Sequence, residues 1–203
     1  MKKLRWTVIA TILAGIGLGV LLIPPEGRGQ TPTYGGTLTI ALSAEPTGLD
    51  PTTSPSATIK RVVHYNLFEG LLKIDRHGRI VPALARSYAI SKDGREYTFH
   101  LHPDIQFHDG SPCTAQDVKF SFQRILDPKT AAPYRMFYEG IESIQTPDPR
   151  TVIFRLKKVD SNFLFNLARG DAVIVSSRSV DRLKSHPIGT GPFRFFEWRR
   201  GDS

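Results

Sequence analysis

The sequence predicts an α+β fold in which short strands dominate and helices occupy the segments between them. Two observations carry this prediction. Three pairs of short segments flank turn sequences, with apolar residues at every second position in 97–101, and an amphipathic helix with a capping pattern follows the second pair. The composition, 40% hydrophobic and 23% charged residues, is that of an ordinary globular protein, and no internal repeat appears. A chain of 203 residues suffices for one large domain or for somewhat more than one small domain.

Three β-hairpins account for most of the predicted strands. In the second hairpin, Tyr97, Phe99 and Leu101 alternate with polar residues, which is the period of a strand with one buried face. Its turn contains Asp93-Gly94, a dipeptide favoured in two-residue hairpin turns. The predicted strand pairs are 71–75 with 80–82, 87–90 with 97–101, and 141–146 with 151–156. Further short strands are expected at 37–42, 172–175 and 193–198.

The most distinct helix is predicted to begin after Thr114. Thr114 can cap this helix, and Asp117 follows three residues later, near the positive end of the helix. The apolar side of the helix is formed by Val118, Phe120, Phe122 and Ile125. Further helical segments are expected at 57–68, 161–169 and 177–183, and the longer loops at 43–56 and 127–138.

The N-terminus is predicted to be a targeting segment. Lys2, Lys3 and Arg5 precede the uncharged apolar run Trp6–Ile23, which is the pattern of an export signal. This run is close to the roughly 18–20 residues that span a bilayer. The segment 1–29 is therefore either a signal peptide or a retained membrane anchor.

Either alternative places the domain outside the cytoplasm. The best candidate for a cleavage site is Gly27-Arg-Gly29, and the residues 30–36 are predicted to be a linker. We therefore expect the domain in the periplasm or at the outer face of the cytoplasmic membrane. The apolar run does not end in a cysteine, so a lipid anchor is not expected.

The charge of the chain does not indicate a nucleic-acid partner. Of the formal charge of +8, four basic residues and one acidic residue lie within 1–29, which leaves +5 for the remainder. The remaining Lys and Arg residues are scattered, and no nucleic-acid-binding motif accompanies them. A solvated basic surface is the better interpretation.

Two groups of residues invite a chemical interpretation, and both have a simpler structural one. His100 and His102 share one strand face and could hold a metal, but no further ligand is evident nearby, so we expect a solvent-facing pair. His108, Asp109 and Cys113 could suggest a nucleophile with its base. They crowd into one short turn, whereas catalytic triads assemble from separated segments. We therefore expect turn and packing roles, with no catalytic residue, metal or cofactor.

The single cysteine excludes an intrachain disulfide. Because an unpaired thiol in an oxidising compartment is usually buried, Cys113 is expected to pack beneath the start of the Thr114 helix. A hydrolase that uses His108 and Cys113 remains as an alternative function.

The segment 97–124 and six others together resemble the extracytoplasmic solute-binding proteins of peptide-type ATP-binding-cassette importers, the dipeptide- and oligopeptide-binding family. The six are Gly36-Thr-Leu-Thr-Ile40, Glu45-Pro-Thr-Gly-Leu-Asp-Pro51, Leu67-Phe-Glu-Gly-Leu-Leu72, Pro82-Ala-Leu-Ala-Arg-Ser-Tyr88, Asp127-Pro-Lys-Thr-Ala-Ala-Pro-Tyr134 and Ile188-Gly-Thr-Gly-Pro-Phe193. Their order and spacing are compatible with the family over nearly all of Gly35–Ser203. Such an ordered set is far more specific than any single short motif.

The resemblance implies a periplasmic-binding-protein-like fold of type II, peptide-binding subclass. It assigns 37–57 and 188–203 to a first lobe and 58–187 to a smaller inserted α+β domain. In the family a further lobe closes the ligand cleft, and it would follow Ser203. The sequence is therefore expected to be an N-terminal portion that lacks the second closing lobe.

The resemblance also implies ligand-binding residues. Tyr134 ends a motif whose tyrosine lines the cleft in oligopeptide-binding relatives; the simpler interpretation is a loop aromatic packed on the preceding helix. The stretch 52–58 corresponds to a segment that pairs main chain with main chain of a bound peptide, a mode that tolerates many side chains. Its simpler interpretation is a solvated loop with a helix cap at Ser56. The ligand-binding residues expected in this stretch are Thr53, Ser54, Ser56 and Thr58.

Gly189 and Gly191 resemble the turn next to the interdomain hinge, where glycine permits backbone angles that other residues resist. A tight turn is the simpler interpretation, and it is compatible with a hinge.

The expected function is the capture of a peptide or similar small solute and its delivery to the membrane subunits of an ATP-binding-cassette importer. Closure of two lobes around the solute would shift the population from open to closed forms. The protein is expected to act as a monomer, with membrane contact through 1–29 if this segment is retained. An alternative is a membrane-tethered remnant that binds solute weakly or not at all, because the closing lobe is missing.

Overall fold

The computed structural model describes residues 35–201, so the predicted signal or anchor segment 1–29 lies outside the described residues. The chain divides into one unit that ends at Ala41 and a second that begins at Leu42. Residues 35–41 of the first unit have no regular structure, so the predicted strand 37–42 is wrong. A strand requires a neighbour for its backbone hydrogen bonds, and among the described residues none pairs with this segment.

The second unit contains a four-stranded antiparallel sheet and a separate two-stranded sheet. The larger sheet has the order β3-β4-β6-β5, built from β3 (Ala85–Ile90), β4 (Glu96–Leu101), β5 (Ile141–Asp148) and β6 (Thr151–Leu156). The smaller sheet pairs β1 (Leu72–Ile74) with β2 (Ile80–Pro82). All three predicted hairpins are thereby confirmed, within two residues at each end.

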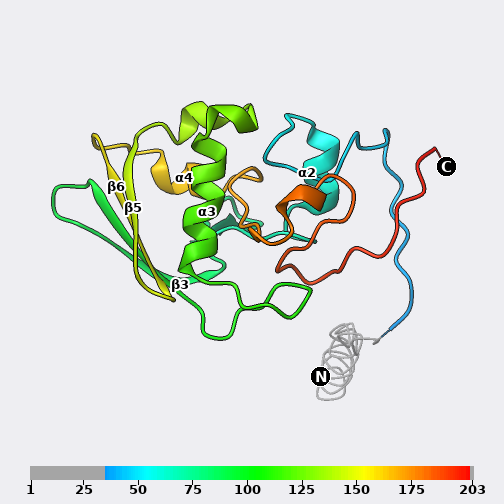
Figure 1. Ribbon diagram of the computed structural model, residues 1–203, viewed down its shortest axis with the longest axis horizontal. Helices are drawn as coiled ribbons and strands as arrows, with labels where there is room; N and C mark the ends of the chain where they lie inside the picture. Colours follow the sequence, from blue (N-terminus) through cyan, green and yellow to red (C-terminus); the bar gives the residue numbers. More distant parts are fainter. Residues whose placement is uncertain (1–34, 202–203) are drawn as a thin grey trace, which may run out of the picture. The chain divides into compact units, whose positions relative to one another are not determined.

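The main core lies between the large sheet and α3 (Ala115–Leu126), which runs alongside β5 and β6 (Figure 1). The strand alternation predicted for β4 is observed, with Tyr97, Phe99 and Leu101 buried. The ring of Phe122 on α3 meets the ring of Phe154 on β6 edge to face, with centroids 5.1 Å apart. Such aromatic contacts, together with the buried apolar area, fix the helix on the sheet.

The start of α3 follows the predicted capping pattern. The Asp117 carboxylate accepts hydrogen bonds from the backbone N–H of Thr114 at 2.9 Å and from its hydroxyl at 3.0 Å. Asp117 therefore satisfies groups that a helix start leaves unpaired, and its negative charge faces the positive end of the helix.

The remaining helices are short. They are α2 (Ala57–Val63), α4 (Phe163–Leu167) and the 3-10 helices η1 (Pro128–Thr130), η2 (Arg135–Phe137) and η3 (Val180–Arg182). The predicted helix 57–68 ends early, because His64 is extended and Tyr65 has a φ of 62°. Its apolar residues nevertheless pack into a second core cluster with Leu49, Val173 and Val175. Within the described residues, no helix has the length and apolar character required to cross a bilayer.

Two further strand predictions are wrong. Residues 172–175 are buried as expected, but they form only a single bridge, between Val173 and Gly70, and no ladder. Residues 193–198 are irregular. In both segments apolar residues favoured a strand, but neither segment forms a ladder with another strand among residues 35–201.

Candidate functional site

A buried carboxylate anchors the loop that precedes the predicted ligand-binding stretch. Oδ1 of Asp50 accepts from the backbone N–H of Thr52 at 2.9 Å and from its hydroxyl at 2.6 Å. Oδ2 of Asp50 pairs with Nη2 of Arg124 on α3 at 2.8 Å, and Arg124 also donates to the Thr52 hydroxyl. Asp50 and Thr52 are almost fully buried. The loop is therefore held rigidly on the long helix.

The predicted stretch continues from this anchor across the start of α2. Thr53 and Ser54 are partly buried, and the Ser54 hydroxyl accepts from the backbone N–H of Ser56 at 3.3 Å. Ser56 precedes the helix, as predicted for a cap, but its side chain makes no capping hydrogen bond. Thr58 lies in the first turn of α2 and not in an extended loop. A small cavity of about 240 Å³ includes Thr53 and Ser54 in its wall.

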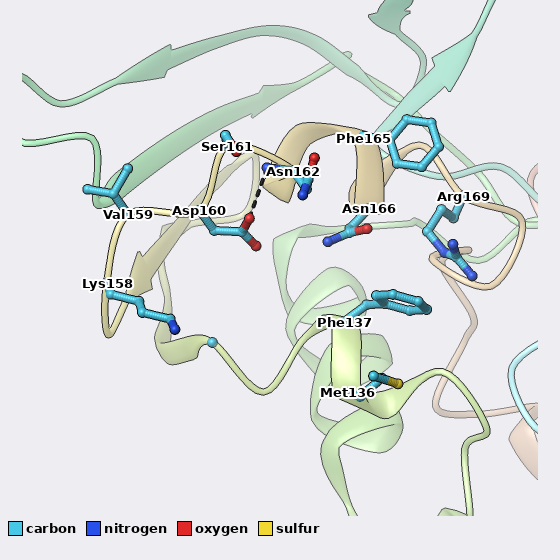
Figure 2. Close-up of a pocket in the computed structure, with 11 residues that line it drawn as sticks. Met136, Phe137, Lys158, Val159, Asp160, Ser161, Asn162, Phe165, Asn166 and Arg169 are labelled. Atoms are coloured by element: carbon cyan, nitrogen blue, oxygen red, sulfur yellow. Dashed lines mark hydrogen bonds between the residues drawn. The ribbon is translucent and has the colours of Figure 1, made fainter.

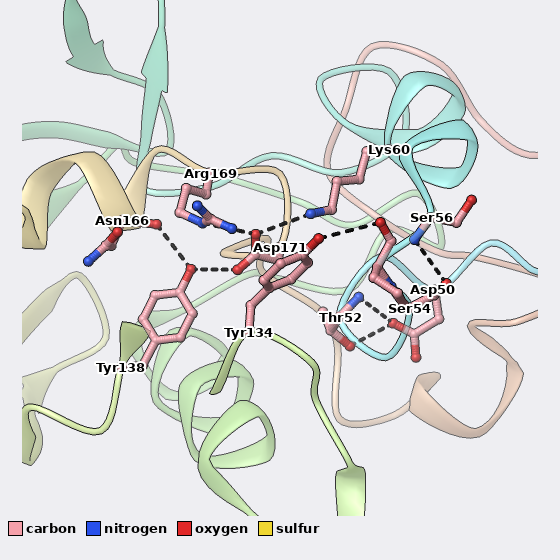
Figure 3. A network of polar contacts seen from close by, with 11 residues as sticks. Asp50, Thr52, Ser54, Ser56, Lys60, Tyr134, Tyr138, Asn166, Arg169 and Asp171 are labelled. Atoms are coloured by element: carbon pink, nitrogen blue, oxygen red, sulfur yellow. Dashed lines mark hydrogen bonds and ion pairs between the residues drawn. The ribbon is translucent and has the colours of Figure 1, made fainter. Parts of the chain in front are cut away.

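The structure brings Tyr134 to this stretch. Its hydroxyl lies 3.4 Å from the carbonyl oxygen of Pro55, between Ser54 and Ser56 (Figure 3). Its ring stacks near Phe137, with centroids 6.1 Å apart. Five predicted binding residues, Tyr134 and four members of 53–58, therefore lie in one neighbourhood although they come from distant parts of the sequence. The hydrogen bond and the ring contacts of Tyr134 are with Pro55, Lys60, Phe137 and Arg169.

A second buried carboxylate lies next to Tyr134. Oδ1 of Asp171 lies 3.4 Å from Nζ of Lys60 and 3.2 Å from Nε of Arg169. Oδ2 accepts from the Tyr138 hydroxyl at 2.8 Å. Burial, and then the neighbouring Asp171 charge, raise the pKa of Tyr138, which therefore remains a proton donor. Figure 3 shows these residues as one polar network beside Tyr134.

Sequence reasoning missed this second group. Lys60 is separated from Asp171 by 111 positions, and no motif or spacing joins the two. The one available signal was the pattern at 169–171, where Arg and Asp flank Gly170 in an otherwise apolar stretch. A charged pair within a buried segment requires a partner, but the sequence does not reveal which.

His64 lies beneath this group. Burial lowers the pKa of His64 to about 4, and the positive charge of Lys60 contributes in the same direction. A Cβ on Gly170 would lie 2.9 Å from Nδ1 of His64, so only glycine allows this approach. His64 is therefore a neutral packing residue at neutral pH.

The two predicted hinge glycines lie against the segment that follows α2. The backbone N–H of Gly191 donates to the carbonyl oxygen of Leu67 at 3.0 Å. A Cβ on Gly189 would collide with that carbonyl, and one on Gly191 would collide with the carbonyl of Asn66. Neither glycine has a positive φ. Close backbone approach, and not the unusual backbone angle that we expected, requires glycine here.

The residues of the hydrolase alternative have structural roles. Nδ1 of His108 accepts from the backbone N–H of Gly189 at 3.2 Å, and Nε2 lies 2.9 Å from the carbonyl oxygen of Gly191. Both ring nitrogens are therefore occupied by backbone groups. Asp109 accepts from Ser111 in its own turn. Cys113 is buried, as predicted, and burial raises the pKa of its thiol, which opposes formation of a thiolate nucleophile.

The histidine pair at the sheet does not gather metal ligands. His102 is exposed, and Nδ1 of His100 lies 3.3 Å from the Thr151 hydroxyl. Within residues 35–201, no group of three or more His, Cys, Asp or Glu side chains is arranged to hold a metal ion.

An open pocket of about 630 Å³ lies on the other side of Arg169, between η2 and α4 (Figure 2). Phe137 and Phe165 contribute apolar walls, while Asn166 and Lys158 contribute polar groups. The guanidinium of Arg169 lies 4.2 Å from the centre of the Phe137 ring, and these two side chains both line the pocket and contact Tyr134.

Comparison with known proteins gives a consistent result. Residues 79–203 match the model of bacterial extracellular solute-binding proteins, family 5, middle region. The chain is 34% identical over 167 residues to the glutathione-binding protein GsiB of Pectobacterium atrosepticum, covering 80% of this chain and 32% of that protein. The chain thus spans about a third of the length of the curated relatives that it matches.

Solved structures agree in fold. The PBP AgaA of A. tumefaciens R10 in complex with agropinic acid matches with a TM-score of 0.72 and 38% identity, over 77% of this chain and 32% of that one. DppA of Helicobacter pylori in complex with the peptide STSA matches with a TM-score of 0.69 and 31% identity, over 77% and 36%. The α+β class and the type II periplasmic-binding-protein-like fold are thereby confirmed. The chain belongs to the bacterial extracellular solute-binding proteins, family 5.

Proposed function

We propose that this chain supplies one wall of a cleft that captures a peptide or peptide-like solute outside the cytoplasm. The captured solute would be delivered to the membrane subunits of an ATP-binding-cassette importer. Membership of the family supports this proposal. So do the relatives, whose names include glutathione, agropinic acid and a peptide as ligands.

The contact of Tyr134 with the stretch 53–58 is the observation that carries the proposal. The Tyr134 hydroxyl lies 3.4 Å from the Pro55 carbonyl oxygen, at an exposed position. Small hydroxyl side chains at 53, 54, 56 and 58 allow another backbone to approach closely and offer donors and acceptors to it. A tyrosine ring adds apolar contact area with a polar tip and loses little entropy on binding. An extended peptide could therefore pair with this surface through its main chain.

The rigid network beneath this surface supports a binding role. The Asp50–Arg124 pair holds the loop against α3. Asp171 holds Lys60 and Arg169, whose charged ends contact the Tyr134 ring. A preorganised surface loses less conformational freedom when a ligand binds. Binding residues in proteins commonly lie on loops that a rigid scaffold positions.

The proposal includes the organisation of the lobes. Residues 37–57 and 188–203 would belong to a first lobe, and 58–187 to the inserted smaller domain. Gly189 and Gly191 would lie where the chain passes from the inserted domain back into the first lobe, and we call this point the crossing. The hinge motion between the lobes would take place close to it. Their backbone contacts with Asn66 and Leu67 support a fixed crossing point next to such a hinge. Closure of two lobes around the solute would then signal occupancy to the importer.

Saturation-transfer NMR on the 203-residue chain in a neutral detergent tests the proposal, because the method detects millimolar affinities. A pool of di- to pentapeptides is the ligand. Tyr134→Ala should weaken binding about tenfold, since the contact area of the ring is lost, whereas Tyr134→Phe keeps the ring and should retain most of the affinity. Tyr88→Ala, on strand β3, is the matched control and should bind as the unchanged chain does.

Two results would contradict the proposal. If the unchanged chain transfers no saturation to any peptide, the membrane-tethered remnant without solute binding becomes the better account. If Tyr134→Ala and Tyr88→Ala weaken binding equally, the peptide contacts another surface.

A further inference from the structure

Lys60 and Arg169 share a single buried carboxylate. Nζ of Lys60 and Nε of Arg169 lie 3.4 Å and 3.2 Å from the same oxygen of Asp171. The Asp171 side chain is 3% exposed, whereas those of Lys60 and Arg169 are 22% and 23% exposed. One carboxylate neutralises one of the two cations, so the group retains a net charge of +1.

The rest of the network does not offset this charge. Asp50 is paired with Arg124 at 2.8 Å, which makes that neighbouring pair neutral. The Tyr138 hydroxyl donates to the second oxygen of Asp171 and adds no charge. A partly buried positive charge without a counter-ion is unfavourable in a folded protein, so a surplus at this position calls for a functional reason.

The hydrogen-bond donors of the two cations are only partly used. Arg169 donates to Asp171 through Nε, and its guanidinium also contacts the Tyr138 hydroxyl, so that only part of its five N–H groups is used by these two partners. Lys60 has three protons on Nζ, and one acceptor, Asp171, lies within reach in the described part of the chain. A guanidinium with unused N–H groups and a neighbouring ammonium form a suitable pair for binding a carboxylate.

Aromatic rings hold both cations in place. Nζ of Lys60 lies 3.9 Å from the centre of the Tyr134 ring, and the Arg169 guanidinium lies 4.9 Å from it. Arg169 also lies 4.2 Å from the centre of the Phe137 ring. These contacts restrict long side chains that would otherwise lose much rotamer freedom on binding.

We propose that Lys60 and Arg169 bind a carboxylate group of the captured solute. The solute class is then peptide-like acids, with an amide backbone on the 53–58 stretch and the acid group beside Tyr134. A net charge of +1 matches one carboxylate. This inference rests on the proposed function, because Tyr134 is what joins the cationic pair to the predicted peptide-binding stretch.

Paired ligands that differ only in the acid group provide the test. N-acetylglycine and N-acetylglycinamide share one peptide bond, but only the former carries a carboxylate. Both are titrated at constant ionic strength into the 15N-labelled 203-residue chain, with the Nε–H resonance of Arg169 as the readout. We expect the acid to bind at least about tenfold more tightly than the amide, the ratio typical of a charge-assisted hydrogen bond.

Variants assign the effect to the two side chains. Arg169→Gln and Lys60→Gln should each lower the affinity for the acid about tenfold and leave the amide unaffected. Arg61→Gln removes the same charge from an exposed neighbouring position on α2 and should have little effect. Asp171→Asn removes the carboxylate that competes for the two cations, so it should strengthen binding of the acid several-fold. A variant whose structure is damaged would bind the acid more weakly instead. Circular dichroism identifies any variant that does not fold. The comparison of acid and amide in the unchanged chain tests the proposal without any variant.

A second pair, Ala-Ala-Ala and its C-terminal amide, separates this inference from the proposed function. Equal binding of the two tripeptides, or an effect of Arg61→Gln as large as that of Arg169→Gln, overturns the carboxylate site and leaves peptide capture standing. Binding of N-acetylglycine at Arg169 without binding of either tripeptide supports the carboxylate site and contradicts peptide capture. Absence of binding by all four compounds overturns both.

Discussion

At the scale of single residues, the buried charges of this domain are expected to contribute strongly to its stability. Asp50 and Asp171 are each almost fully buried, and each is compensated by cations from distant positions. Removal of one partner from such a pair costs far more than loss of a surface ion pair.

Asp50→Ala should therefore lower the free energy of unfolding by about 3 kcal/mol, because Arg124 loses its counter-ion in a position where its side chain is 15% exposed. Urea unfolding followed by circular dichroism measures this change. Asp93→Ala, which breaks an exposed pair with Arg95, is the control and should cost clearly less than Asp50→Ala. Equal losses in the two variants would show that Asp50 has no special role.

The pH dependence of stability should carry the signature of His64. Its pKa in the folded state is about 4, below the value of 6.5 of an unperturbed histidine, so the unfolded state binds the additional proton first. The stabilisation is complete above pH 6.5 and is lost as the pH falls from 6.5 towards 4. Since His64 remains partly accessible, we expect a loss on the order of 2 kcal/mol across this window.

Unfolding of the unchanged chain and of His64→Gln at pH 7.5 and pH 4.5 measures this effect. The unchanged chain should lose more stability between the two values than the variant. The lowered pKa values of Asp75 and Asp93 act below pH 4 and do not interfere in this window. Parallel losses in both proteins would mean that His64 is not responsible.

Cys113 should be inert in the native protein. Its side chain is buried, and burial raises the pKa of the thiol, so both access and thiolate formation are suppressed. Alkylation with iodoacetamide at pH 8 should be slow in the native chain and fast in 6 M urea. Rapid alkylation of the native chain would revive the alternative of a reactive thiol and, with it, the hydrolase.

At the scale of elements, the sequence predicted the hairpins and the helix start that depend on residues close together in the chain. The three hairpins were found from their turns and from the alternation of apolar residues, as in Tyr97, Phe99 and Leu101. The start of α3 was found from Thr114 and Asp117, whose hydrogen bonds are the ones expected. These elements satisfy their backbone groups through neighbours that are close in sequence, so the pattern alone was sufficient.

Elements that depend on distant partners were predicted poorly. The segments 37–42 and 193–198 have apolar residues suited to a strand, but a strand also needs a partner that the local sequence cannot reveal. Likewise, the grouping of Lys60 and Arg169 on Asp171 joins positions more than one hundred residues apart. For the candidate site, the family resemblance indicated Tyr134 and 53–58, whereas the charged group became visible only in three dimensions.

The crossing at Gly189 should be intolerant of any side chain. A Cβ there would collide with the backbone carbonyl of Leu67, which hydrogen bonds hold in place. Gly189→Ala should therefore destabilise the protein by about 2–3 kcal/mol, measured by urea unfolding. Gly140→Ala is the control, because its Cβ would meet nothing within 4 Å and its φ is not positive, so the change should be small. An unchanged free energy of unfolding in Gly189→Ala would contradict this prediction and show that the backbone at 67 and 189 can move apart at little cost.

At the scale of the whole molecule, residues 42–201 present a supported surface with backbone groups, an aromatic ring and a surplus positive charge. The long helix α3 and the sheet support this surface, and the residues that form it come from 50–60, 134–138 and 166–171. His108 and Cys113, the residues of the hydrolase alternative, have structural roles: both ring nitrogens of His108 contact backbone groups, and Cys113 is buried. The proposed capture and transfer of a solute would make use of all three features.

Mapping of the backbone amide resonances of the 15N-labelled chain during titration with Ala-Ala-Ala tests this account most directly. We predict that the shifts gather at residues 53–60, at Tyr134 and at Arg169. The account would be contradicted if these resonances stay unchanged at saturating tripeptide, or if the shifts gather instead around Phe165 and Lys158 in the pocket beyond Arg169.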